Sequence, residues 1–211
     1  HLTKDYGSGR GVFDVSFKIE KGEVFGFLGP NGAGKSTTIR HLMGFSHPGQ
    51  GNTKILGMDS FKDYDRILNK VGYIPGEIAL PQGLTGYQFI DMMQHMYHVN
   101  NKEMLDKMLN LFELKENELK CDTKHMSLGV KRKLAIVTAF MSDPEVLILD
   151  EPTSGLDPIM QQRFIDFVIE TYFPSKSSPS LTKLAKYANC EPFSIINGLF
   201  MFPFPPAKLH L

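Results

Sequence analysis

The sequence predicts an α/β fold with a mostly parallel sheet, an inserted helical subdomain and an irregular C-terminal tail. Apolar segments with strand-like patterns alternate with helical patterns through residue 77, which is typical of a parallel sheet. Residues 78–142 show helical patterns only, and the residues after Tyr172 contain frequent prolines and little periodicity of either kind. These three observations define the expected organisation of the chain.

The α/β part is predicted from strands and helices that follow one another along the chain. Partial alternation and short apolar runs indicate strands at residues 12–19, 23–28, 53–56, 71–74 and 146–149. Helical periodicity indicates helices at residues 35–45, 64–70 and 158–171. Residues 146–149 form a continuous apolar run, Val-Leu-Ile-Leu, as expected for a strand that is buried on both faces.

Three consecutive helical patterns without a strand between them predict the inserted subdomain. They cover residues 85–99, 102–114 and 127–141. We therefore expect residues 1–77 and 143–170 to form an α/β core and residues 78–142 to form a helical subdomain. Residues 171–211 are expected to be an atypical tail that is foreign to the fold.

Composition limits the classes of protein to which the chain can belong. Its 211 residues suffice for one globular domain with a large core. The 23 basic and 23 acidic side chains cancel, which argues against nucleic acid as a partner. The two cysteines, Cys121 and Cys190, lack the spacing of a metal site and fit a reduced setting. No apolar run reaches the roughly 20 residues that span a bilayer, so we expect any membrane role to be peripheral.

A glycine-rich turn between a predicted strand and a predicted helix matches the phosphate-binding pattern G-x-x-x-x-G-K-[ST]. Its residues are Gly29, Pro30, Asn31, Gly32, Ala33, Gly34, Lys35 and Ser36, and Thr37 follows them at the helix start. Glycines let backbone N–H groups approach phosphate oxygens, and the start of the helix presents its positive dipole end to them. Lys35 adds a charge for the β- and γ-phosphates, and the Ser36 hydroxyl can ligate Mg²⁺. The pattern predicts a P-loop nucleotide site, and the competing interpretation is a glycine-rich turn without a ligand.

Two carboxylates follow the strand predicted to be buried on both faces. Asp150 and Glu151 come directly after residues 146–149, at the carboxyl edge of the sheet where ligands bind in doubly wound folds. Asp150 is predicted to hold the Mg²⁺ shell. Glu151 is predicted to orient and deprotonate the attacking water as a general base. The alternative is a strand that simply ends in solvated acids.

The segment from Asp150 to Pro158 reads Asp-Glu-Pro-Thr-Ser-Gly-Leu-Asp-Pro. With the P-loop upstream, it resembles the Walker B motif and D-loop of the ABC ATPase family. The resemblance covers about residues 2–170, and the motifs come in the family's order and spacing. It implies a P-loop ATPase core that binds ATP and Mg²⁺, and it places Asp157 of the D-loop with Glu151 among the catalytic residues.

Two further segments match family motifs. Tyr6 lies 29 residues before Lys35, where the family places an aromatic that stacks on adenine. An exposed surface tyrosine is the competing interpretation. Residues 126–130, Met-Ser-Leu-Gly-Val, stand where the family has its signature Leu-Ser-Gly-Gly-Gln, and Ser127 and Gly129 match it. The resemblance implies that this loop caps the γ-phosphate of ATP on the opposite subunit, and Ser127 is also a good helix N-cap.

Leu128 and Val130 depart from the signature sequence, and the chain departs from the family in two further places. Gly76 stands where the family has the glutamine of its Q-loop, and Glu77 or Gln82 are the candidates to replace it. A strand with a switch histidine is expected some thirty residues after Glu151, yet the only histidine beyond His125 is His210. We expect the tail to come from a shifted reading frame or a fusion to unrelated coding sequence. Loss of the last strands would leave an unpaired strand edge and exposed apolar core, and so poor solubility.

The resemblance implies the ATP-hydrolysing subunit of a transporter, and the whole pattern is most similar to bacterial drug and antibiotic exporters. Its partners would be a second ATP-binding subunit and a membrane-spanning permease, at the cytoplasmic face of the membrane. A first alternative is a hydrolysis-impaired remnant that binds ATP without turnover. A second is a relative that acts on DNA or ribosomes, which the short helical insert, the one cassette and the neutral charge disfavour.

Overall fold

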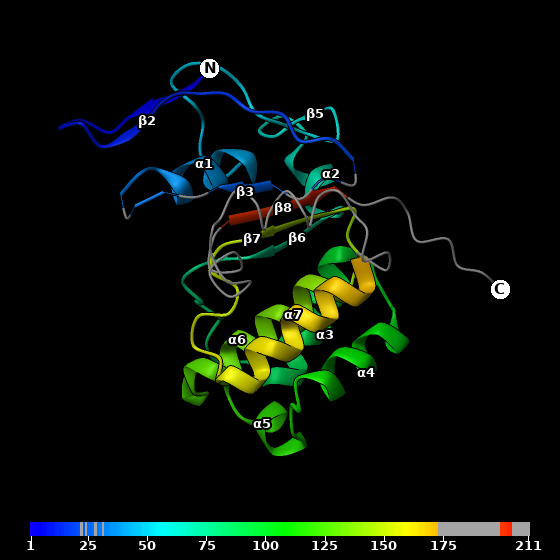
Figure 1. Cartoon of the computed structure of the whole chain (residues 1–211). Helices are drawn as coiled ribbons and strands as arrows, with labels where there is room; N and C mark the ends of the chain where they lie inside the picture. Colours follow the sequence, from blue (N-terminus) through cyan, green and yellow to red (C-terminus); the bar gives the residue numbers. More distant parts are fainter. Residues whose placement is uncertain (22, 24, 28, 31, 173–198, 204–211) are drawn as a thin grey trace.

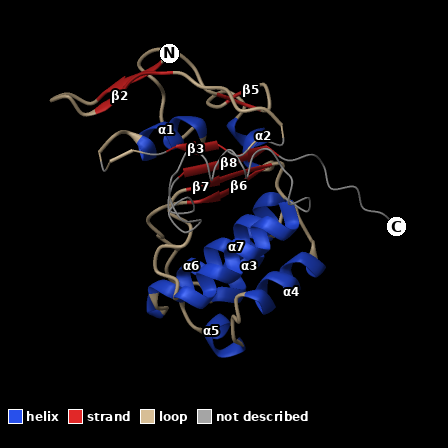
Figure 2. Ribbon diagram, in the orientation of Figure 1, coloured by secondary structure: helices blue, strands red, loops and turns tan. Residues whose placement is uncertain are grey.

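In the computed structural model, residues 1–21, 23, 25–27, 29–30, 32–172 and 199–203 are described (Figure 1). A central sheet separates two groups of helices, as Figure 2 shows. The short helices α1 (Lys35–Leu42) and α2 (Tyr64–Leu68) lie on one side of the sheet, and the longer helices lie on the other. This arrangement confirms the predicted α/β class and puts a core on each face of the sheet.

The central sheet has 4 strands in the order β3-β8-β7-β6. Their bounds are β3 Phe25–Phe27, β6 Val71–Ile74, β7 Val146–Leu149 and β8 Leu199–Pro203. Strand β6 is parallel to β7, and β8 is antiparallel to both β3 and β7. The strands β3, β7 and β6 therefore run in one direction, as predicted for a mostly parallel sheet.

Strand β7 is buried along its whole length. All four of its residues are buried, and its register with β6 pairs Val71 with Val146 and Ile74 with Leu149. The pairing continues one residue further, because the backbone N–H of Asp150 donates to the Ile74 carbonyl at 2.9 Å. The strand predicted from the Val-Leu-Ile-Leu run is confirmed, and it delivers its last residue to the edge of the sheet.

Two antiparallel hairpins lie beyond the short helices (Figure 1). They consist of β1 (Leu2–Asp5) with β2 (Gly11–Val15) and of β4 (Lys54–Ile55) with β5 (Met58–Asp59). The strand expected at residues 12–19 is thus shorter than predicted, and β1 was not predicted. The core on this side of the sheet combines apolar residues of α1, α2, β6 and β7, including Ile39, Ile67 and Ile148.

The helical subdomain is present where three helical patterns predicted it. Its elements are α3 (Gly86–Tyr97), α4 (Lys102–Leu111), α5 (Glu116–Lys120), the 3₁₀ helix η1 (Thr123–His125) and α6 (Leu128–Phe140). Side-chain caps start the three predicted helices: Thr85 with a capping box, then Asn101 and Ser127. Helix α5 was not predicted, because five residues are too few to show periodicity.

Helix α7 (Pro158–Tyr172) packs with the subdomain helices beneath the sheet (Figure 2). Phe140 at the end of α6 is fully buried, and its ring lies 5.9 Å from that of Phe164, 5.3 Å from Phe167 and 6.0 Å from Tyr172. These three rings belong to α7. The aromatic cluster therefore joins α6 to α7, and both helices begin at loops predicted to carry function. Among the described residues, no helix combines the length and the apolar composition needed to cross a bilayer.

The prediction of a wholly irregular tail is wrong for residues 199–203. These residues form β8, which pairs with β3 on one side and with β7 on the other. The prediction of an unpaired edge on the strand beside the missing ones does not hold for β7, since β6 and β8 occupy both of its sides. The physical reason is that β3 and β7 both carry backbone N–H and C=O groups that need partners, and an apolar segment can satisfy both strands at once.

The remaining tail residues, 173–198 and 204–211, lie outside the described residues, and so do His210 and Cys190. The origin of residues 171–211 in foreign coding sequence stays a prediction. Helix α7 ends at Tyr172, two residues beyond the predicted end of the α/β core.

The aromatic junction of α6 and α7 allows a test of what stabilises the fold. Phe140→Ala removes a fully buried ring and leaves a cavity, so we expect it to lower the free energy of unfolding by about 3–5 kcal/mol. The matched control is Phe13→Ala, because the Phe13 side chain is 53% exposed, and its effect should stay within about 0.5 kcal/mol. Urea denaturation followed by circular dichroism measures both. Equal losses for the two variants would contradict the assignment of this core.

Candidate nucleotide site

The glycine-rich loop connects β3 to α1 and packs on the second strand of the first hairpin. Gly34, the last glycine of the loop, has φ 86°, a left-handed conformation that side chains rarely adopt. A Cβ atom at this position would lie 2.4 Å from Cγ1 of Val12 and 2.9 Å from the carbonyl oxygen of Gly11. Only glycine fits here, so the loop can approach β2 closely and turn into the helix. Asn31 of the predicted loop lies outside the described residues.

Helix α1 begins at Lys35, the predicted phosphate ligand. The Lys35 ammonium donates to the carbonyl oxygens of Gly29 at 2.6 Å and Pro30 at 3.0 Å, so it lies over the loop. Gly34 occupies the N-cap without a side-chain cap, and the positive end of the helix dipole faces the same loop. A positive helix end and an ammonium group around one turn form an arrangement that suits phosphate.

The two predicted Mg²⁺ ligands meet across the sheet edge. The Ser36 hydroxyl donates to Oδ2 of Asp150 at 3.3 Å, although 114 residues separate them in sequence. Asp150 is buried to 9% exposure, and Ser36 lies in the first turn of α1. A hydroxyl and a carboxylate are the hard oxygen donors that Mg²⁺ prefers, so the residues present fit this ion. Their role as metal ligands stays a prediction.

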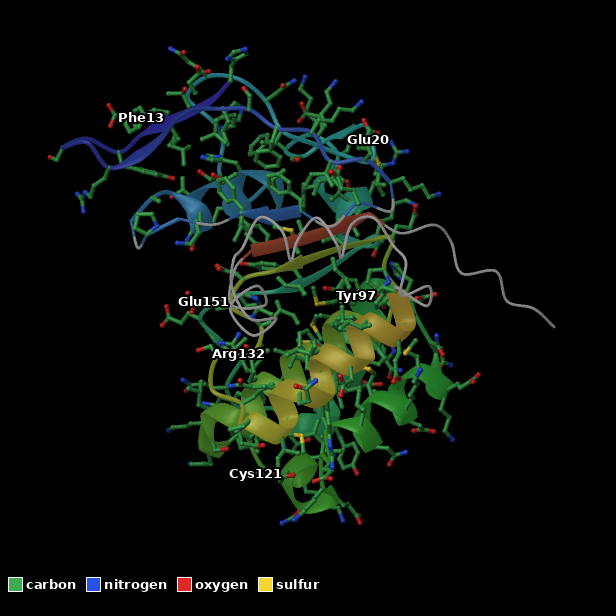
Figure 3. The ribbon with its side chains drawn as sticks, viewed as in Figure 1. Phe13, Glu20, Tyr97, Cys121, Arg132 and Glu151 are labelled. Carbon is green, nitrogen blue, oxygen red and sulfur yellow. The ribbon has the colours of Figure 1, made fainter. Side chains whose placement is uncertain are left out.

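Glu151 follows Asp150 in a strained backbone conformation. Its φ is 47°, which costs free energy for a residue with a side chain and is most often retained at functional sites. The side chain is exposed, and Figure 3 shows it beyond the end of the sheet, with Arg132 at the same end. Glu151 is therefore open to water next to the predicted metal ligand, where a general base would have to stand.

The signature loop contacts the D-loop turn. A Cβ atom at Gly129 would lie 3.3 Å from the Gly155 carbonyl oxygen, so these two loops touch through their backbones. The Ser127 hydroxyl accepts from the N–H of Val130 at 3.3 Å, which confirms its N-cap role at the start of α6. Asp157 is also engaged in capping, because its carboxylate accepts from the N–H of Met160 at 3.0 Å at the start of α7. The catalytic role of Asp157 stays a prediction.

Tyr6 and Thr37 are the two other residues that were predicted to contact the nucleotide. Tyr6 is 51% exposed on the first hairpin, and the Lys4 ammonium lies 5.8 Å from the centre of its ring. A flat exposed ring suits both adenine stacking and an ordinary surface position, so both interpretations remain. Thr37 is half-buried in the first turn of α1.

Arg132, a residue of α6 that lies in none of the sequence motifs, reaches this site. Its side chain is only 2% exposed, and Nη1 and Nη2 donate to the carbonyl oxygens of Pro75 at 2.8 Å and Gly76 at 2.6 Å. Burial lowers the pKa of the guanidinium, and attraction to Glu151 and Asp150 opposes that shift. An arginine stays charged in either case. The sequence gives no signal for this position, because Arg132 stands between Lys131 and Lys133 and such a basic run is usually exposed.

Gly76, where a glutamine was expected, packs directly on the predicted metal ligand. A Cβ atom there would lie 3.1 Å from Oδ2 of Asp150, closer than side chains normally come. The backbone of this loop therefore takes the space next to Asp150. Glu77 and Gln82, the predicted substitutes, are both exposed, and their role stays a prediction.

Known proteins match this chain over the residues that form the candidate site. The family model described as ABC transporter matches residues 12–154. Among curated relatives, the bacitracin transport ATP-binding protein BcrA of Bacillus licheniformis is 39% identical over 158 residues, which are 75% of this chain and 51% of the relative. The Nod factor export ATP-binding protein I of Rhizobium meliloti is 35% identical over 159 residues, 74% of this chain and 48% of the relative. The chain thus spans about half the length of these curated relatives.

Solved structures show the same fold. The structure of an ATP-binding subunit of an ABC transporter superposes with a TM-score of 0.73 at 32% identity, covering 81% of this chain and 72% of that one. A dimeric ATP-binding cassette in a post-hydrolysis state with ADP and Pi has a TM-score of 0.70 at 22% identity, with 82% and 81% of the two chains covered. The second likeness concerns the fold alone.

The pKa of Tyr73 on β6 depends on its burial and on the charge of Asp150. Burial first, and then the negative charge of Asp150, raise the Tyr73 pKa to about 12, while Arg40 opposes them. The folded state therefore favours the neutral phenol. Below about pH 10, the pKa of tyrosine in the unfolded chain, the full contribution of the neutral Tyr73 to the free energy of unfolding is present. This contribution is lost as the pH rises through about 12.

We therefore expect Tyr73→Phe to lose less stability than the wild type between pH 9 and pH 11.5. The difference should be about 1 kcal/mol, allowing for the partial exposure of the ring. Urea denaturation at both pH values gives the measurement, with Tyr87→Phe, at a residue 44% exposed, as the control for loss of a hydroxyl. Identical pH dependence in the wild type and Tyr73→Phe would show that this phenol titrates as it does in water.

Proposed function

The chain belongs to the ABC transporter family, and from this premise we propose that it binds and hydrolyses ATP to drive export across a membrane. The observation that carries the proposal is the meeting of Ser36 and Asp150 at 3.3 Å beside Lys35. Three groups that would contact the phosphates and the metal converge there from two distant parts of the sequence. Export is supported by the relatives, one named for bacitracin transport and another for Nod factor export.

In this proposal, the P-loop and Lys35 bind the β- and γ-phosphates, and Ser36 and Asp150 hold Mg²⁺. When bound, Mg²⁺ would neutralise part of the charge on the phosphate oxygens. Glu151 accepts a proton from a water molecule as that water attacks the γ-phosphorus. The bond to the β-phosphate oxygen breaks, and ADP and inorganic phosphate are the products. The exposure of Glu151 at the sheet edge gives water access to its carboxylate.

The proposal includes two partners. The first is a second ATP-binding subunit, whose signature loop would cap the ATP on this chain, as Ser127 and Gly129 would cap the other. These residues lie at the start of α6, where a serine and a helix N-terminus can receive an anion. The second is a membrane-spanning permease, on which this chain would dock from the cytoplasmic face of the membrane. We propose residues 1–77 and 143–170 as the nucleotide-binding core, with residues 78–142 as the signature subdomain and residues 171–211 outside both.

One observation favours a second candidate, a subunit that binds ATP with little turnover. The family's switch histidine is expected on a strand after α7, and β8 follows α7 with the sequence Leu-Phe-Met-Phe-Pro. That strand pairs directly with β7, next to the Walker B carboxylates, and contains no histidine. Loss of one positioning or acid–base group commonly costs about 10²–10⁴-fold in rate and leaves binding intact.

Phosphate release from ATP with Mg²⁺ separates the two candidates. We expect Glu151→Gln to lower the rate by at least about 10²-fold while binding of a fluorescent ATP analogue is kept, because the general base is lost and the phosphate site is not. Lys35→Ala should instead weaken binding of the analogue. Glu113→Gln, a change of an exposed carboxylate paired with Arg163, serves as the control.

The outcomes are distinct. Release that disappears in Glu151→Gln supports the ATPase, and binding without release in the wild type supports the second candidate. Release that is equal in the wild type and Glu151→Gln contradicts the role of Glu151. A wild-type chain that does not bind the analogue contradicts both candidates.

A further inference from the structure

Arg132 connects the signature helix to the backbone that lies against Asp150. We propose that Arg132 is a positioning residue: its guanidinium holds the Pro75–Gly76 backbone on Asp150. This inference rests on the proposed function, because Asp150 is taken as the metal ligand. It assigns a task to a side chain that no sequence motif singled out.

The contacts form a continuous path. Nη1 and Nη2 of Arg132 donate to the carbonyls of Pro75 and Gly76 at 2.8 Å and 2.6 Å. The Gly76 backbone is so close to Asp150 that a Cβ atom would lie 3.1 Å from Oδ2. The same oxygen accepts the Ser36 hydroxyl at 3.3 Å. A shift of α6 therefore moves the loop, and the loop contacts the carboxylate that ligates the metal.

The shape of the arginine side chain is what this task requires. Two parallel N–H donors on a planar fork hold two successive carbonyls in one fixed orientation, whereas a lysine ammonium in their place would be a rotatable point charge that does not fix that orientation. Arg132 is also buried, with 2% of the residue exposed, so bulk water has little access to the two contacts. Arg132 lies one turn beyond the signature residues, on the same helix. Any change at the signature loop that moves the helix would be transmitted to Pro75 and Gly76.

Charge offers a competing explanation, and it predicts the opposite sign. Arg132 interacts electrostatically with Asp150 and Glu151. If its charge were what mattered, Arg132→Gln would weaken binding of metal-free ATP more than of Mg²⁺-ATP, since the free nucleotide is more negative. The preference for Mg²⁺-ATP would then rise in Arg132→Gln and stay unchanged in Arg132→Lys. If position matters, Asp150 is misplaced in both variants and the preference falls in both.

The test measures this preference with the full chain. The dissociation constant of a fluorescent ATP analogue is determined in EDTA and in Mg²⁺. The ratio of the value in EDTA to the value in Mg²⁺ reports how much the protein's metal ligands contribute to binding. We expect Arg132→Lys and Arg132→Gln each to lower the ratio by about 10-fold, the loss usual when groups that orient a metal ligand are removed. The value in EDTA should change less than about 3-fold in Arg132→Lys, because that variant keeps the charge and the two hydrogen bonds of the fork go to Pro75 and Gly76.

Two further variants complete the experiment. Lys131→Gln changes a charge at the preceding residue of α6 and should leave the ratio unchanged. Gly76→Ala keeps Arg132 but brings a methyl group against Asp150, so it should lower the ratio as well, and it decides the matter if the Arg132 variants do not fold.

A rise of the ratio in Arg132→Gln, or an unchanged ratio in Arg132→Lys or Gly76→Ala, overturns the inference and leaves the proposed function standing. A wild-type ratio near 1 overturns it as well, since the protein would then contribute nothing to the metal. A wild type that does not bind the analogue overturns the proposed function and the inference with it.

Discussion

The burial of β7 between two neighbouring strands is the constraint on which the rest of the molecule depends. Its four apolar side chains have contacts in both cores, and its backbone is paired on both sides. A strand held in this way ends at a defined point, and the next residue is Asp150. The carboxylate therefore reaches the sheet edge at the level of the P-loop helix, where Ser36 meets it. The packing of the apolar residues of β7 thus determines the position of the Asp150 carboxylate.

Helix α6 transmits the same constraint to the other half of the molecule. At its end, Phe140 is enclosed by rings of α7, and near its start Arg132 holds the carbonyls that follow β6. A buried guanidinium is costly unless its donors are used, and here two of them are used on one loop. The helix is therefore fixed to the hydrophobic core at one end and to the nucleotide site at the other. A motion of the subdomain that carries α6 would reach both.

Local patterns in the sequence predicted much of the fold. Strands β6 and β7 and helices α3, α4, α6 and α7 were predicted close to their observed bounds, because their periodicity or apolar runs extend over enough residues. Helix α5 is too short for that signal, and β1, with the sequence Leu-Thr-Lys-Asp, is as long as β6 and β7 but contains no apolar run. Strand β8 was missed for another reason: its place depends on backbone groups of β3 and β7, which are more than fifty residues away. Pairing between distant segments leaves little trace in the local pattern.

The sequence by itself determined the P-loop, the carboxylates Asp150 and Glu151 and the order of the motifs, because each depends on residue type and spacing along a short segment. Only the tertiary structure decided that Ser36 and Asp150 are neighbours and that Gly76 lies against Asp150. Only the tertiary structure also showed a role for Arg132, because that role depends on the carbonyls of Pro75 and Gly76, to which its guanidinium donates, and not on the sequence of α6. Contacts between distant segments depend on how the strands and helices pack, and the sequence shows the two residues of such a contact without showing that they meet.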